Sequence, residues 1–261
     1  MIIALDVGNT ETTIGLFEKA ELKSHWRITT DSTRTPDEWG LLLHSLMQAV
    51  QIPPDRIAGA AIASVVPPVT GPLAEACSEW LNVAPVVIDG LSRLPIILEV
   101  DEPLTVGADR IVNTLAASKL YGLDMIVVDL GTATTYDCIT AAGVFLGGVI
   151  APGLRSLAET LFRRTSKLPA IELVPPARVI GKRTEECIRA GVVFGTAESI
   201  DGLVRRIKKE WPSAAVPKVI ATGGLAPLLA PLCDEIDSVD LHLTLQGLRL
   251  AHEILTAQTD G

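Results

Sequence analysis

The sequence predicts an α/β protein made of two similar halves, and a repeated hairpin is the main reason. Ile2 to Leu5 is a short apolar run that enters Asp6-Val7-Gly8-Asn9-Thr10, after which the chain returns as a second apolar run. The pattern begins again 123 positions later, with Asp129 matching Asp6 and Thr135 matching Thr12. Self-similarity at a fixed offset indicates a duplicated structural unit. Segments with helical and strand periodicity follow each hairpin, so both halves are expected to be α/β domains.

The elements of the first half follow in order after its hairpin. Two helix-like segments and one strand-like segment are expected at Glu38 to Val50, Gly71 to Leu81 and Val86 to Asp89. A further helix is expected from Gly107 to Leu120, because apolar residues within it fall on one helical stripe. We place the domain boundary in this helix. The N-terminal domain would then span residues 1–115 and the C-terminal domain residues 116–261.

The second half begins with its own hairpin. Ile126-Val127-Val128 enters Asp129-Leu130-Gly131-Thr132, and the returning strand is expected from Tyr136 to Thr140. A helix is expected from Thr184 to Ile200 and a strand from Lys218 to Ala221. Because no Ser-rich or Gly-rich linker separates the halves, we expect them to meet across a cleft.

Composition and charge exclude several classes of protein. Hydrophobic residues make up 48% of the chain and charged residues 20%, which excludes a disordered or fibrous protein. The formal net charge of -9 argues against nucleic acid as a partner. With no apolar run of membrane-spanning length and no basic signal-peptide region, we expect a cytoplasmic protein without a membrane partner. The four cysteines form no metal-binding pair and are expected to be buried thiols.

The hairpin loops carry residue types that suit a nucleotide phosphate. Gly8 allows a phosphate to approach the backbone closely. The hydrogen-bond donors around it are Asn9, Thr10, Thr12 and Thr13. The carboxylate of Asp6 would repel a phosphate unless a cation lay between them, so Mg²⁺ is implied if ATP binds here. One such loop is equally well explained as an ordinary turn, but two loops at matching positions favour a nucleotide site.

Further motifs occur in a fixed order along the chain. After the Asp6 hairpin they are Gly107-Ala108-Asp109-Arg110, Asp129-Leu130-Gly131-Thr132-Ala133-Thr134, Gly147-Gly148 with Pro152-Gly153, Gly181-Lys182-Arg183-Thr184 and Thr222-Gly223-Gly224. The two hairpins resemble those of the acetate and sugar kinase, heat-shock chaperone and actin superfamily. In the order and spacing of all its motifs the chain resembles the type III pantothenate kinases over nearly its whole length.

This resemblance implies a fold and an activity. The expected fold is two similar α/β domains of the actin-like, ribonuclease H-like ATPase type flanking a nucleotide cleft. The expected reaction is ATP-dependent phosphorylation of pantothenate to 4'-phosphopantothenate, the first step of coenzyme A biosynthesis. The alternatives are a kinase of the same fold for another small hydroxy compound and a non-catalytic nucleotide-binding regulatory protein. Only a kinase needs a base, and the base position of the family is occupied here by Asp109.

The resemblance implies a role for each residue of the first half's motifs. Asp109 would be the general base, since a carboxylate need only orient the hydroxyl and accept its proton late in a loose phosphoryl-transfer transition state. Arg110 would pair with the carboxylate of pantothenate, and Gly107 and Ala108 would adjoin the same substrate. The whole first loop would bind ATP, namely Asp6, Val7, Gly8, Asn9, Thr10, Glu11, Thr12 and Thr13. The alternative is that Gly107 to Arg110 only start a helix, with Asp109 near its positive end.

In the second half the resemblance implies cation and phosphate contacts. Asp129 would coordinate a monovalent cation, K⁺ or NH₄⁺; the alternative is that it caps the turn at Gly131 or Thr132. ATP would contact Gly131, Thr132, Gly148 and Gly223.

Two further positions bear on the acceptor substrate. Thr184 would reach the pantothenate of a neighbouring subunit, which implies a homodimer; the alternative is an N-cap at the start of a helix. The family usually carries Tyr three residues before a Pro ahead of Gly-Ala-Asp-Arg. Here Val100 stands three residues before Pro103. One polar contact to pantothenate is therefore expected to be missing.

Overall fold

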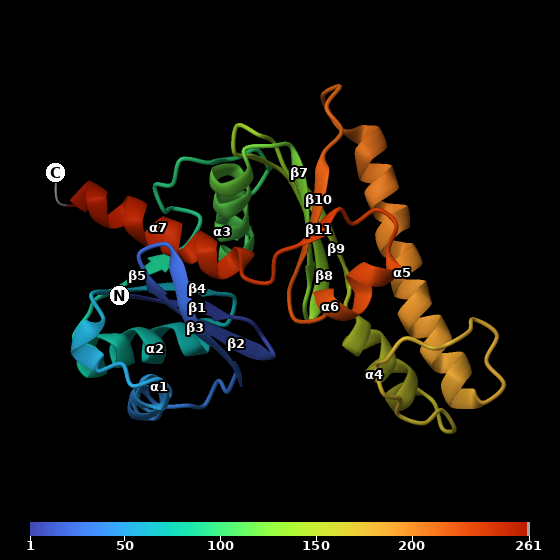
Figure 1. The fold of residues 1–261 in the computed structure, drawn as a ribbon, viewed down its shortest axis with the longest axis horizontal. Coiled ribbons are helices and arrows are strands. Elements are labelled where there is room, and N and C mark those ends of the chain that lie inside the picture. The colour runs from blue at the N-terminus through green and yellow to red at the C-terminus, as the bar shows by residue number, and fades with distance from the viewer. Residues whose placement is uncertain (260–261) are drawn as a thin grey trace. The chain divides into compact units, whose positions relative to one another are not determined.

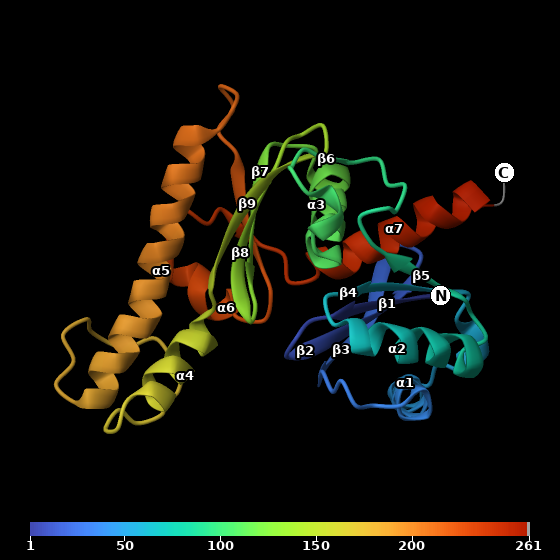
Figure 2. The ribbon, with the colours of Figure 1, turned by 180° about the vertical axis from the view of Figure 1, so that it is seen from behind.

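The computed structural model describes residues 1–259, and the chain divides into two compact units. Unit 1 consists of Met1–Leu120 together with the chain from Leu243 onward, and unit 2 consists of Tyr121–His242. Figures 1 and 2 label the elements of both units. Each unit combines one sheet with helices, so the predicted α/β class is confirmed.

Unit 1 is built on a sheet with the strand order β3-β2-β1-β4-β5. The strands of this sheet are β1 (Ile2–Val7), β2 (Glu11–Glu18), β3 (Glu21–Thr29), β4 (Gly59–Ser64) and β5 (Pro85–Ile88). The short strand β6 (Ile97–Leu98) also lies in this part of the chain but is not a member of the sheet. Its helices are α1 (Pro36–Ala49), α2 (Pro67–Trp80), α3 (Ala108–Ala116) and α7 (Leu243–Thr259), with the helical turns η1 (Pro54–Arg56), η2 (Pro103–Thr105) and η3 (Ala117–Tyr121). β1 pairs antiparallel with β2, which confirms the first predicted hairpin.

Helices cover both faces of this sheet (Figures 1 and 2). Ile3 and Leu5 of β1 pack with α1 and α2 on one face, whereas Ala4 packs with α3 and α7 on the other. Side chains alternate along a strand, so Asp6 projects from the same face as Ala4. The sheet therefore directs the Asp6 carboxylate to the side that carries α3.

The last helix, α7, belongs to unit 1. Leu245 and Leu248 of α7 are buried in the core cluster that contains Ala4 and α3. A buried hydrogen bond of 2.9 Å also joins Thr244 Oγ1 to Asn113 Oδ1 of α3. The division into residues 1–115 and 116–261 is corrected accordingly: the first crossing between units lies at 120/121, and the chain returns to unit 1 at 243.

Unit 2 is built on a second sheet, whose strands within the unit follow the order β11-β10-β7-β8-β9. They are β7 (Met125–Leu130), β8 (Ala133–Ile139), β9 (Val144–Pro152), β10 (Lys218–Thr222) and β11 (Ser238–Val239). The helices are α4 (Leu154–Arg164), α5 (Thr184–Glu210) and α6 (Ala226–Leu229), with the turn η4 (Ala230–Leu232). α5 continues past the predicted end at Ile200, because Val204 extends its buried stripe against β7.

The two hairpins share a motif but differ in length by one residue. Asp6 pairs with Thr13 in the first hairpin, and Asp129 pairs with Thr135 in the second. Thr135 therefore corresponds to Thr13, and the match of Thr12 with Thr135 is corrected. The turn hydrogen bonds show the same difference, since Gly8 N donates to the oxygen of Glu11 and Gly131 N to that of Ala133.

The four cysteines do not share one environment. Cys77 is buried as predicted, and Cys138 and Cys233 are partly buried. Cys187 lies in the first turns of α5 and is exposed, so the prediction of a buried thiol is wrong for this residue. None of the helices in residues 1–259 has both the length and the apolar character needed to cross a bilayer.

Candidate active site

The first hairpin of unit 1 leaves its turn open to solvent. Asn9 and Thr10 are exposed, and Asp6 and Thr13 face each other across β1 and β2. Two other residues of the predicted ATP loop point away from this surface. The Val7 side chain is fully buried in the core beside α1 and α2, so only its backbone can meet a ligand.

Thr12 is the second of these residues. Its side chain is 0% exposed, and its hydroxyl lies 2.9 Å from Thr30 Oγ1. The prediction that Thr12 donates directly to a phosphate is corrected by this burial. Its partner Thr30, the residue after the end of β3, also donates to the Gly8 carbonyl oxygen at 2.7 Å. No motif in the sequence indicated that Thr30 is part of the site.

Asp109 lies in the first turn of α3, near the carboxyl end of β1. Gly107 precedes this helix, and a Cβ added to it would lie 3.4 Å from Val65 Cγ1. The Val65 N–H donates to the Val7 oxygen at 3.0 Å. The Asp109 carboxylate folds back over Gly107, and its Oδ1 accepts the Arg110 N–H at 2.9 Å. Asp109 and Asp6 therefore share one edge and one face of the unit 1 sheet.

Burial dominates the electrostatics of Asp109. Desolvation raises the pKa of its carboxyl group, although the backbone bond and the guanidinium of Arg110 act in the opposite direction. A carboxylate that only capped a helix would have a lowered pKa, because the helix start favours the charged form. A raised pKa makes the carboxylate a better proton acceptor, and such groups mark functional sites.

The segment ahead of α3 forms the approach to Asp109. Val100 is half-buried in the loop between β6 and η2, and Arg110 is half-buried in α3. Ala108 is 6% exposed and packs in the core with α7, so only its backbone can line a substrate.

The second hairpin is supported by the start of α4. Gly131 and Thr132 form its turn, and Thr132 is exposed. Gly153, the N-cap of α4, lies so close to this turn that a Cβ would meet the Gly131 oxygen at 2.8 Å. Ser156 Oγ donates to the Thr132 oxygen at 3.1 Å. Ser156 is a second residue that the sequence did not single out.

Asp129 and the loop after β10 lie together at the carboxyl ends of two parallel strands. Thr222 pairs with Asp129, and Gly223 follows with φ +87. A Cβ at Gly223 would overlap Asp129 Oδ1, so only glycine leaves room for this carboxylate. The Gly131 N–H serves the Ala133 oxygen at 3.0 Å, which argues against a cap by Asp129 at Gly131, whereas the alternative of a cap at Thr132 stays open. Gly148 lies apart from this loop, paired with Asp137 between β8 and β9.

Thr184 is exposed at the first position of α5. The N-cap is Arg183, and no side-chain hydrogen bond caps the helix. The alternative that Thr184 is an N-cap is therefore not what the structure shows.

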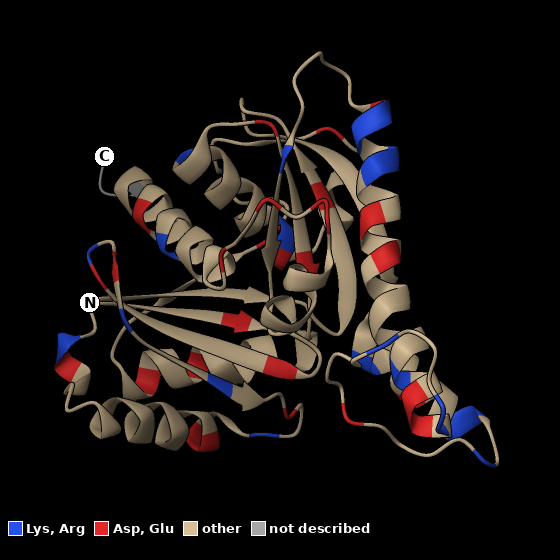
Figure 3. Ribbon diagram, turned by 45° about the vertical axis from the view of Figure 1, so that its right-hand side comes forward, with Lys and Arg blue, Asp and Glu red and all other residues tan. Residues whose placement is uncertain are grey.

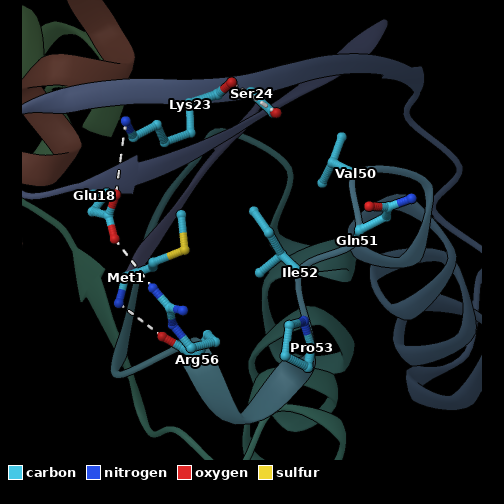
Figure 4. A pocket seen from close by; sticks show the side chains of 9 residues that line it. All are labelled: Met1, Glu18, Lys23, Ser24, Val50, Gln51, Ile52, Pro53 and Arg56. Atoms are coloured by element: carbon cyan, nitrogen blue, oxygen red, sulfur yellow. Dashed lines mark hydrogen bonds and ion pairs between the residues drawn. The ribbon is translucent and has the colours of Figure 1, made fainter.

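A separate pocket of about 330 Å³ lies at the opposite edge of the unit 1 sheet, where β1 begins. Glu18 pairs there with Lys23 at 3.7 Å and with Arg56 at 3.2 Å, as Figure 4 shows. The charged residues of this pocket are paired with one another, and the pocket does not adjoin the hairpin turn. In the part of the chain that the structure describes, no group of three or more His, Cys, Asp or Glu side chains is arranged to hold a metal ion.

Comparison with known proteins identifies close relatives along nearly the whole chain. A family model described as type III pantothenate kinase matches residues 2–206. The type III pantothenate kinase of Anaeromyxobacter dehalogenans (strain 2CP-C) is 46% identical, covering 97% of this chain and 99% of the relative. That of Geobacillus kaustophilus (strain HTA426) is 44% identical over 97% of each chain.

Solved structures match the fold at low identity. Component A of Acidaminococcus fermentans (R)-2-hydroxyglutaryl-CoA dehydratase aligns with a TM-score of 0.59 and 12% identity, covering 100% of this chain and 99% of its own. The ROK hexokinase of Thermus thermophilus aligns with a TM-score of 0.51 and 12% identity over 100% and 99% of the two chains. The expected fold, with two α/β domains of the actin-like ATPase type, is thereby confirmed.

Proposed function

Because the chain belongs to the type III pantothenate kinase family and phosphorylates pantothenate with ATP in coenzyme A biosynthesis, we propose that Asp109 is the general base of this reaction. The observation that carries the proposal is the partly buried carboxylate at the start of α3, held over Gly107 and bonded to the Arg110 N–H. It would orient the primary hydroxyl of pantothenate and take its proton as the phosphoryl group transfers.

The neighbouring groups of unit 1 divide the remaining tasks. Arg110 adjoins Asp109 and would pair with the carboxylate of pantothenate, because a guanidinium binds carboxylates in a bidentate manner. Asp6 faces the α3 side of the sheet and carries the oxygen ligand that Mg²⁺ prefers. The metal would neutralise phosphate charge, and Asp6 with the exposed turn of Asn9 and Thr10 would hold the phosphates.

In unit 2 we assign the monovalent cation to Asp129. The missing Cβ of Gly223 leaves space for its carboxylate, and an oxygen ligand suits K⁺ or NH₄⁺. The exposed Thr132 and the Gly131 backbone would contact the phosphates. Replacing Asp129 with Ala should abolish stimulation by K⁺ while the fold persists. An unchanged response to K⁺ would contradict this assignment.

The test of the base is Asp109→Asn, which keeps the shape and removes the proton acceptor. Turnover should fall by about two orders of magnitude or more, with little change in ATP affinity. Asp101→Asn is the matched control, since Asp101 is exposed on the preceding loop and has no assigned role. Near-parental turnover of Asp109→Asn would remove Asp109 from the mechanism.

We also propose a homodimer through α4 and the N-terminal half of α5. Phe162 on α4 is 49% exposed and lines an apolar pocket of about 330 Å³ with Ile171 and Leu173. On α5, Gly191 and Gly195 are exposed with nothing near their Cβ positions, so a partner helix could approach closely. The ribbon in Figure 3 marks both basic (blue) and acidic (red) residues along α4. Such a dimer would bring Thr184 to the partner's substrate.

The dimer is tested by a charge placed on its face. Phe162→Asp should yield a monomer by light scattering. Leu41→Asp, at a 56% exposed apolar residue of α1 in unit 1, should leave the mass unchanged. A dimeric Phe162→Asp protein would refute this interface.

A cytoplasmic location fits ATP as the co-substrate, and we keep it as part of the proposal.

A further inference from the structure

Thr30 follows β3 and forms hydrogen bonds with three residues of the first hairpin. Its N–H donates to the Thr10 oxygen at 3.0 Å. Its Oγ1 donates to the Gly8 oxygen at 2.7 Å and lies 2.9 Å from Thr12 Oγ1. A single residue outside the loop therefore holds both sides of the turn.

The direction of these hydrogen bonds follows from the number of protons. A hydroxyl carries one proton, and a carbonyl oxygen can only accept. Because the Thr30 proton goes to the Gly8 carbonyl, the Thr12 hydroxyl must donate to Thr30. Thr12 is 0% exposed, so its proton is used inside the protein. The Thr12 hydroxyl therefore donates to the Thr30 hydroxyl, which in turn donates to the Gly8 carbonyl oxygen.

The Gly8 carbonyl belongs to the same peptide unit as the Asn9 N–H. In a trans peptide the C=O and N–H bonds point in opposite directions. Thr30 holds this carbonyl inward, so the Asn9 N–H points outward, at a residue that is exposed. Hydrogen bonds in a chain polarise one another, which makes this N–H a stronger donor.

We propose that Thr30 is a positioning residue of the phosphate loop: by fixing the Gly8 carbonyl, it aims the Asn9 N–H at a phosphate of the bound nucleotide. This proposal rests on the proposed assignment of the Asp6 hairpin to ATP. Thr30 then acts on the triphosphate and not on the adenosine moiety or on pantothenate.

The experiment compares three variants of the full chain. Thr30→Val keeps the branched shape and removes the hydroxyl, whereas Thr30→Ser keeps the hydroxyl. Thr29→Val is the matched control, because Thr29 is the exposed neighbour on β3. The Kd values of ATP and adenosine, the KM of pantothenate and the melting temperature are measured for each.

For Thr30→Val we expect the Kd of ATP to rise about tenfold, as for loss of a buried hydrogen bond. The adenosine Kd and the pantothenate KM should stay at their parental values. Thr30→Ser should restore ATP binding, and Thr29→Val should not change it. A fourth variant, Thr30→Ala, carries the same expectation and replaces Thr30→Val if the valine disturbs the neighbouring strand β3.

An unchanged ATP Kd in a folded Thr30→Val or Thr30→Ala protein would overturn the proposal, as would equal losses for ATP and adenosine. A parental protein that binds ATP no more tightly than adenosine would refute the assignment of the hairpin as well. The two failures are distinguishable, because only the second concerns the unaltered protein.

Discussion

Gly107→Ala should inactivate the enzyme by moving its base rather than by removing it. A Cβ at position 107 would fall closer to Asp109 Oδ1 than real Cβ atoms come to any neighbour, whereas ordinary contact begins at 3.4 Å. The carboxylate must therefore retreat by about 1 Å, and a displacement of that size costs on the order of 100-fold in rate. This corresponds to about 2.7 kcal/mol of transition-state stabilisation.

The assay is kcat and KM for both substrates, together with thermal unfolding. We expect kcat to fall and the KM of ATP to stay constant, because the hairpin is not touched. Gly202→Ala in α5 is the matched control: nothing lies within 4 Å of its Cβ position, so activity should persist and the helix should gain stability. Full turnover by a folded Gly107→Ala protein would refute the reasoning that the glycine positions Asp109.

Three further outcomes are expected. Because burial raises the pKa of Asp109, kcat/KM should fall on acidification at a higher pH than for an ordinary carboxyl group. The folded state binds this proton more tightly than the unfolded state, so the stability of the protein falls as the pH rises through the pKa of Asp109. Asp109→Asn should therefore unfold at a higher temperature than the parent at pH 7. An unshifted acidic limb, or a lower melting temperature, would contradict this. Gln51 follows α1 with φ 57, so Gln51→Gly should raise the free energy of unfolding, measured in urea, by about 0.5 to 1 kcal/mol. Asn82→Gly, at φ 56, should raise it by less, because Asn tolerates this backbone conformation. Equal gains for the two variants would count against the argument. Val100→Tyr should raise kcat/KM for pantothenate several-fold where the ring fits, and a decrease would indicate a pocket reshaped around Val100.

The sequence predicted those features that local patterns encode. The hairpins follow from a repeated motif between apolar runs, and the helix after Gly107 follows from its apolar stripe. The position of α7 could not be found in this way, because its burial depends on Asn113 and Ala4, more than a hundred residues away. A single domain boundary along the chain cannot describe a segment such as α7, which belongs to unit 1 although it follows unit 2 in the sequence.

The candidate site shows the same limit on a smaller scale. Sequence reasoning identified Thr12 as a polar loop residue, but strand pairing decides which face it occupies. Thr12 falls on the buried face and Thr13 on the face of Asp6. Thr30 carried no signal, because its importance lies in what it contacts across β2 and β3.

The turns of the two hairpins are held in place by different contacts. The turn of Gly8 depends on the Thr30 hydroxyl, and Ser can supply the same group. The turn of Gly131 is instead in direct backbone contact with Gly153, where a Cβ would meet main-chain oxygens that cannot move aside. Loss of one group at the first turn should therefore weaken binding by degrees. One added carbon at Gly153 should displace the whole second turn, so the second hairpin tolerates less change although its motif is the same.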